Sequence, residues 1–67
     1  MTDERLDGYI YAKQYHQETL KESSDEEIEF LINKFTIEFE QNKKMNALGM
    51  ADYYREYLDE RRKRGNR

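Results

Sequence analysis

The sequence predicts an all-α fold: a small bundle of three helices built on a central helical hairpin over about residues 25–45 and 50–64. Three observations lead there. The 67 residues include no proline, 40% of them are charged, and the apolar residues recur at helical spacing. This composition favours helices over a sheet. Partial disorder is the alternative because only 36% of the residues are apolar, but six tyrosines and three phenylalanines argue against a fully disordered chain.

The first predicted helix covers residues 3–21, and the segment 21–24 is the expected turn. Tyr11 and Tyr15 form an i,i+4 pair on one side. Lys13 and His16 interrupt the opposite side, and Gly8 lowers helix stability by roughly 1 kcal/mol relative to alanine. The apolar stripe of that opposite side consists of Leu6, Tyr9, Ile10 and Leu20.

The second predicted helix covers residues 25–45 and has the clearest start. Ser24 and Glu27 have the spacing of a capping box, in which each side chain bonds the backbone of the other residue. Phe30 and Ile37 lie on the side opposite the main stripe, so this helix has more apolar surface than one neighbour needs. The main stripe consists of Ile28, Leu31, Ile32, Phe35 and Phe39.

The third predicted helix covers residues 50–64 and should pack on the second. Gly49, with Asn46 shortly before it, is the expected break, because glycine and asparagine tolerate the left-handed conformation that ends helices. One long helix kinked at Gly49 is the alternative. The apolar stripe consists of Met50, Tyr53, Tyr54, Tyr57 and Leu58, and we expect its tyrosines to face residues 25–45.

Two arrangements would cover Phe30 and Ile37. In the first, the stripe of the N-terminal helix packs on them and closes a three-helix bundle through Leu6, Ile10 and Leu20. In the second, the N-terminal helix docks elsewhere, and a homodimer or a foreign protein covers the open face.

The residue inventory predicts a single domain over 1–67 with no catalytic residues, no metal and no cofactor. The chain has no cysteine, which excludes disulfides and thiolate zinc sites. Ser23 and Ser24 are explained by the helix start, and the three glycines are scattered rather than grouped in a phosphate-binding loop. His16, the single histidine, could be a proton shuttle or metal ligand, but a partly exposed helix residue near an interface is the simpler interpretation.

The sequence also predicts a cytoplasmic protein that does not enter a membrane. Residues 1–10 lack the basic and apolar regions of a secretory signal, and no stretch has the length and apolarity of a membrane span. A helix lying on a membrane surface is disfavoured by the acidic body of the chain.

A basic tail over residues 61–67 is the strongest alternative signal. It carries a charge of +5, whereas residues 1–60 hold 7 basic and 15 acidic side chains, or −8. Such tails bind nucleic acids or anionic membranes. Pairing of Asp59 with Lys63 and of Glu60 with Arg64 would compensate part of this charge. The residues of a nucleic-acid site would be Arg61, Arg62, Lys63 and Arg64.

The sequence therefore favours a small non-catalytic protein-protein interaction module. We expect a regulator, inhibitor or adaptor, of the kind that bacteria and phages encode, which docks a helical face on a larger protein. The alternative is a dimeric nucleic-acid-binding module that uses the basic tail. The expected contact residues for the protein partner are the large side chains without a place in the hairpin core: Tyr11, Tyr15, Phe30 and Ile37.

Overall fold

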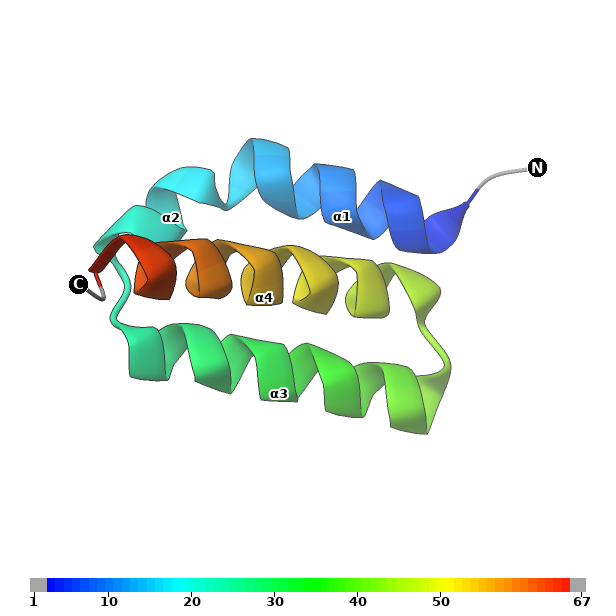
Figure 1. Cartoon of the computed structure of the whole chain (residues 1–67). Helices are drawn as coiled ribbons and strands as arrows, with labels where there is room; N and C mark the ends of the chain where they lie inside the picture. The colour runs from blue at the N-terminus through cyan, green and yellow to red at the C-terminus, as the bar shows by residue number, and fades with distance from the viewer. Residues whose placement is uncertain (1–2, 66–67) are drawn as a thin grey trace.

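The computed structural model describes residues 3–65 and contains four helices over that range. They are α1 (Glu4–Tyr15), α2 (Gln17–Glu22), α3 (Asp25–Asn42) and α4 (Met45–Gly65), with no strand among the described residues. α4 lies in the middle, with α1 and α2 on one side and α3 on the other (Figure 1). The all-α prediction is confirmed, whereas the predicted count of three helices is wrong.

The fourth helix arises because the predicted helix over 3–21 is divided at His16. The backbone of His16 leaves the helical region, with φ −108° and ψ 0°. Its N–H still donates to the carbonyl of Ala12, and its carbonyl accepts from the N–H of Leu20, so the residue ends α1 and begins α2. The change of direction accompanies the burial of Leu20, which has no exposed surface.

The start of α3 is as predicted, but its end and the start of α4 are not. Both hydrogen bonds of the capping box between Ser24 and Glu27 are present. The chain leaves α3 at Lys43, whose φ of 57° is left-handed and whose N–H donates to the carbonyl of Phe39. Gly49 was the expected break, yet it lies inside α4. The left-handed turn is thus taken by a lysine, where sequence preference points to glycine or asparagine.

Gly49 serves a different purpose, which is to let α1 approach α4. A Cβ placed on it would overlap the carbonyl of Arg5, and a Cβ on Gly8 would overlap the carbonyl of Asn46. Ala12, one turn beyond Gly8, is fully buried. The two backbones are therefore in contact through their smallest residues.

This close approach changes which side of α1 is buried. Leu6 and Ile10, predicted to pack inward, are 52% and 41% exposed, because the glycine side of α1 faces α4 instead. α1 does not cover Phe30 and Ile37, since α1 and α3 each pack on α4 rather than on each other. The central helix is thus α4, and of the two expected arrangements the one in which the N-terminal helix covers Phe30 and Ile37 is not formed.

The tyrosines of α4 are shared between its two neighbours. The Tyr53 ring meets the Tyr9 ring of α1 edge to face at 5.5 Å, while the Tyr54 ring lies 5.7 Å from Phe35 of α3. The prediction that they all face residues 25–45 is therefore wrong. The buried apolar core consists of Ala12, Leu20, Ile28, Ala47, Ala51, Tyr53, Tyr54 and Leu58.

Candidate partner-binding surfaces

The four predicted contact residues lie on two separate surfaces. Tyr11 and Tyr15 are on α1, and Phe30 and Ile37 are on α3, on the other side of α4 (Figure 1). All four are exposed, between 49% and 67%. A single partner helix could not contact both pairs at once without spanning α4, so each surface needs its own explanation.

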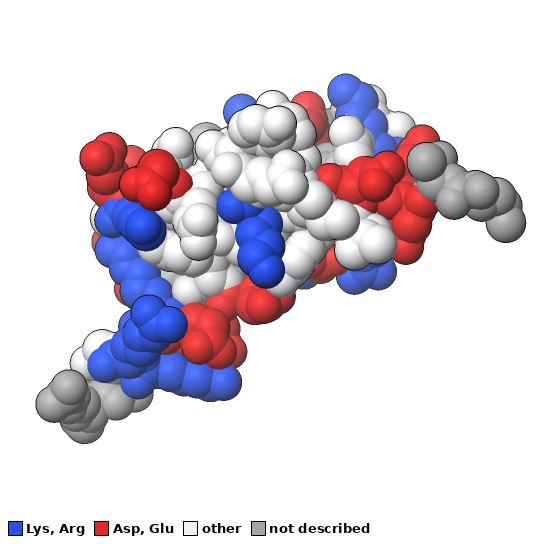
Figure 2. Space-filling view, turned by 90° about the horizontal axis from the view of Figure 1, so that it is seen from above, with Lys and Arg blue, Asp and Glu red and all other residues white. Residues whose placement is uncertain are grey.

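The first surface, called here the α1 face, consists of Leu6, Ile10, Tyr11 and Tyr15. The rings of Tyr11 and Tyr15 pack together with centroids 4.8 Å apart. Seen from the α1 side, residues other than Lys, Arg, Asp and Glu occupy much of the middle of the molecule around a basic side chain, and other charged side chains gather toward its ends and edges (Figure 2). Exposed apolar side chains grouped on one helix are typical of an interaction surface.

The α1 face belongs to a helix without net charge. Between residues 4 and 15, Glu4 and Asp7 balance Arg5 and Lys13. Arg5 is also held toward α4, because its Nε lies 2.6 Å from Asp52 Oδ2. Nothing in the overall charge of α1 therefore opposes the approach of a neutral apolar surface.

The second surface, called here the α3 face, consists of Phe30 and Ile37 together with a shallow groove. Phe30 and Ile37 are seven residues apart, or about two helical turns, so they point in the same direction away from α4. The groove has a volume of about 460 Å³ and lies where α2 leads into α3. Its lining residues are Thr19, Ser23, Ser24, Glu26, Glu27, Phe30 and Leu31.

The α3 face belongs to a strongly acidic helix. From residue 25 to 42 the chain has six carboxylates and one lysine, a net charge of −5. Asp25 and Glu29 are engaged by arginines of α4, whereas Glu26 and Glu27 line the groove. Neither Glu26 nor Glu27 forms an ion pair with another residue of the range 3–65, and an apolar anchor beside such acidic side chains favours a partner that carries basic residues.

His16 joins the α1–α2 junction to the core. Its Nδ1 lies 2.5 Å from the hydroxyl of Tyr54, and the two rings stack with centroids 6.0 Å apart. Tyr54 is only 1% exposed, and burial raises its pKa to about 12. His16 satisfies a buried hydroxyl, which agrees with the interpretation of a partly exposed residue at an interface.

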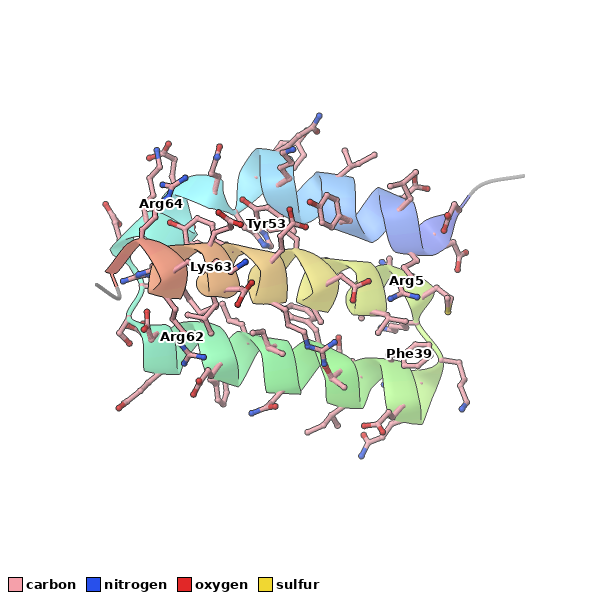
Figure 3. All side chains as sticks on the ribbon, in the orientation of Figure 1. Arg5, Phe39, Tyr53, Arg62, Lys63 and Arg64 are labelled. Carbon is pink, nitrogen blue, oxygen red and sulfur yellow. The ribbon has the colours of Figure 1, made fainter. Side chains whose placement is uncertain are left out.

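A second tyrosine bond crosses between α1 and α4. The hydroxyl of Tyr9 donates to Glu56 at 2.7 Å, and this hydrogen bond raises the pKa of Tyr9 to about 12. Tyr53, between α1 and α4 in Figure 3, has its pKa raised by burial. The hydroxyls of Tyr9 and Tyr54 thus bond α1 and the α1–α2 junction to α4.

Much of the basic tail is engaged inside the molecule. Arg61 donates from Nη1 to the carbonyls of Ser23 and Leu20 at 2.6 and 3.3 Å, and its Nε lies 3.3 Å from Asp25. It thereby ties α4 to the end of α2 and the start of α3. Arg62 points toward α3, where it pairs with Glu29 (Figure 3).

The remaining cations of the tail are more exposed. Lys63 pairs with Asp59 at 3.4 Å, as predicted. The predicted pair of Glu60 and Arg64 is not formed, and Arg64 has no ion pair with another described residue. The last two residues of the predicted tail, 66 and 67, lie outside the described residues. The four predicted nucleic-acid contacts therefore do not form one free basic surface.

No group of three or more histidine or acidic side chains in residues 3–65 is arranged to hold a metal ion. Within the same range, no helix combines the length and apolarity that crossing a membrane requires. Comparison of the chain with protein-family models, curated proteins and solved structures gave no match. Arguments about function therefore rest on the two exposed faces.

Leu6 and Ile10 were missed as surface residues by sequence reasoning, and so was the groove beside Phe30. The sequence did contain a pattern that predicts the exposure of Leu6 and Ile10. Gly8 and Ala12 are small residues four apart, a spacing that lets helices approach closely, and they mark the side opposite Leu6 and Ile10. The groove had no comparable signal, since it depends on how α2 meets α3.

Proposed function

We propose that this protein is a small interaction module, a regulator, inhibitor or adaptor, that docks its α3 face on a basic amphipathic segment of a larger protein. The observation that carries the proposal is Phe30, which is 66% exposed beside a groove on the most acidic helix of the chain. Exposed aromatic anchors in the middle of a surface are typical binding hot spots.

Charge decides between the possible occupants of this face. A second copy would bring another helix of net charge −5 against the first, and like charges facing each other across an interface are destabilising. A partner with lysines or arginines beside an apolar side chain would meet Glu26 and Glu27 favourably while filling the groove. The expected partner is therefore a foreign basic segment.

The alternative of nucleic-acid binding has less support. Arg61 and Arg62 are held by Asp25 and Glu29, so using them on phosphates would require breaking contacts that join α4 to α3. Homodimerisation, the second part of that alternative, does not depend on the tail.

Peptide selection on the purified protein would test the proposal. Random peptides that bind should combine an apolar side chain with lysine or arginine. Phe30→Ala should weaken their binding at least about tenfold, a loss of about 1.4 kcal/mol. Replacing both Glu26 and Glu27 with glutamine should weaken binding less and reduce its salt dependence. Glutamine at position 27 keeps the capping box, so the helix start is preserved.

Tyr15→Ala is the matched control, because it removes an equally exposed aromatic ring from the α1 face. Its affinity for the selected peptides should equal that of the wild type. Acidic peptides, or peptides whose binding is lost in Tyr15→Ala but kept in Phe30→Ala, would show that the α3 face is not the docking site. Affinity capture from the native host, with wild type beside Phe30→Glu, Ile37→Glu, then identifies the partner.

A further inference from the structure

We infer that the α1 face binds a second copy of this chain, with the two α1 helices antiparallel and a two-fold axis passing between Ile10 and Tyr11. This arrangement does not depend on docking at the α3 face. It explains why Ile10 and Tyr11 remain 41% and 51% exposed on a helix that packs on α4 with glycine and alanine, and it places Leu6 and Tyr15 at the edges of the contact.

The charges of the two helices favour self-association at α1. A two-fold interface brings the same surface of both copies together, so any net charge on it faces itself. α3 carries −5 and would repel its copy, whereas residues 4–15 carry two acidic and two basic side chains and have no net charge. Of the two apolar faces, only the α1 face suits self-association on this ground.

The order of side chains along α1 suits an antiparallel contact. In a helix with about 100° between residues, Asp7, Ile10 and Gln14 point away from the buried side of Gly8 and Ala12, and Tyr11 lies at the flank of the helix beyond Asp7. An axis between residues 10 and 11 places Ile10 against Ile10 of the second copy and Tyr11 against its Tyr11. It also places Asp7 opposite Gln14 twice, where the amide can donate to the carboxylate.

A parallel arrangement would be worse for the same side chains. It would put Asp7 opposite Asp7, and like charges in such a position are destabilising. It would also align the two helix dipoles, whereas antiparallel helices oppose them favourably. Antiparallel pairing is therefore the expected orientation.

The size of the patch indicates a weak dimer. Four half-exposed side chains provide on the order of 400 Å² of apolar surface per copy, about half of the roughly 800 Å² per partner in a stable interface. We therefore expect a dimer that dissociates in the micromolar range. Two such copies would present two α3 faces, which would let a partner with repeated basic segments bind more tightly.

Cysteine cross-linking tests this arrangement directly, because the natural chain has no cysteine. Single substitutions Ile10→Cys and Tyr11→Cys lie near the proposed axis, within the separation of about 4.4–6.8 Å between Cα atoms that a disulfide needs. Under mild oxidation both should form dimers at least about tenfold faster than Phe30→Cys, a more exposed position on α3 that reports random collision.

A second pair of variants shows whether the two α1 helices are antiparallel or parallel. Asp7→Cys and Gln14→Cys should each cross-link slowly alone and rapidly when mixed, because only the mixture brings the two positions together. Sedimentation equilibrium of the wild type should show a concentration-dependent dimer that is lost in Ile10→Glu. Circular dichroism of each variant checks that the helices are intact.

Two results would overturn the inference. One is an Ile10→Cys rate no higher than that of Phe30→Cys, and the other is Asp7→Cys linking to itself faster than to Gln14→Cys. Either result leaves docking at the α3 face standing, since peptide binding is measured separately with Phe30→Ala. Conversely, if the wild-type protein bound no peptide, the expected cross-linking pattern would be unchanged.

Discussion

The two sides of α4 are packed according to different physical rules. Toward α1 the contact is backbone against backbone, with Gly8 and Gly49 in place of side chains and polar bonds such as Tyr9–Glu56 at the rim. Toward α3 the contact is made by large apolar side chains, among them Ile28 and Phe35. The α1–α4 interface therefore depends on small residues that let the backbones approach, and the α3–α4 interface depends on large buried side chains.

This difference predicts opposite sensitivities to substitution. At the α3 side, removing methylene groups leaves a cavity and loses the transfer free energy of the buried atoms. At the α1 side, adding a single methyl group forces the helices apart. It also explains why the larger residues of α1 are left on the surface, where they become available to a second copy.

Ile28→Ala should have the largest effect. Ile28 has no exposed surface, and deleting a buried isoleucine side chain to alanine costs about 2–5 kcal/mol. In a chain of this size that is most of the stability. Urea unfolding followed by circular dichroism measures the loss. Ile37→Ala, the same change at a 49% exposed position of the same helix, should cost much less. Equal costs would mean that α3 does not pack as described.

Gly49→Ala should have the next largest effect on stability, and it tests directly whether the backbones of α1 and α4 are in contact. The new methyl group would meet the Arg5 carbonyl, and overpacking of this kind costs about 1–3 kcal/mol. Alanine is by itself better in a helix than glycine by about 1 kcal/mol, so a net loss cannot come from helix propensity.

Gly65→Ala is the control for that substitution. A Cβ at Gly65 meets nothing within 4 Å. Unfolding experiments should therefore find the Gly65→Ala protein as stable as the wild type or slightly more so. Stabilisation by Gly49→Ala as well would show that α1 and α4 are not in backbone contact.

A rise of the pH just above 10 should have the smallest effect. The folded pKa of Tyr54, about 12, lies above the ordinary value of 10.0, so the unfolded chain loses its proton first. The contribution to stability is complete below pH 10 and is lost as the pH rises toward 12, at a rate of at most about 1.4 kcal/mol per pH unit. Unfolding should be measured across this range.

Tyr54→Phe identifies the source of that pH dependence. The variant has no hydroxyl to titrate, so its stability should fall less steeply above pH 10, although it also loses the bond to His16. Tyr15→Phe, at a position 67% exposed, should keep the wild-type slope. An unchanged slope in Tyr54→Phe would assign the alkaline loss to other groups.

The sequence predicts local structure here better than it predicts packing. The start of α3 was predictable because Ser24 and Glu27 encode the capping box within four residues. The break at Lys43 was not, since a left-handed lysine costs free energy that only the surrounding fold can offset. Gly49 was misread because glycine serves equally at helix ends and at close helix contacts, and only the partner helix decides which.

For the candidate surfaces, too, local features were predictable from the sequence and packing was not. The exposure of Tyr11, Tyr15, Phe30 and Ile37 was foreseeable, because the hairpin core had no place for them. Their separation onto two faces was not foreseeable, since it depends on α4 lying in the middle. Helical periodicity gives the direction of a side chain around its own helix but does not say which neighbour stands there.

The central place of α4 has a consequence for synthesis. α1, α2 and α3 precede α4 in the chain, and α1 and α3 pack on α4 rather than on each other. Until α4 has been translated, the earlier helices have no common surface on which to bury Ala12, Leu20 and Ile28. A chain that ends before residue 45 therefore has exposed apolar stripes and no core, which makes it a substrate for chaperones and proteases.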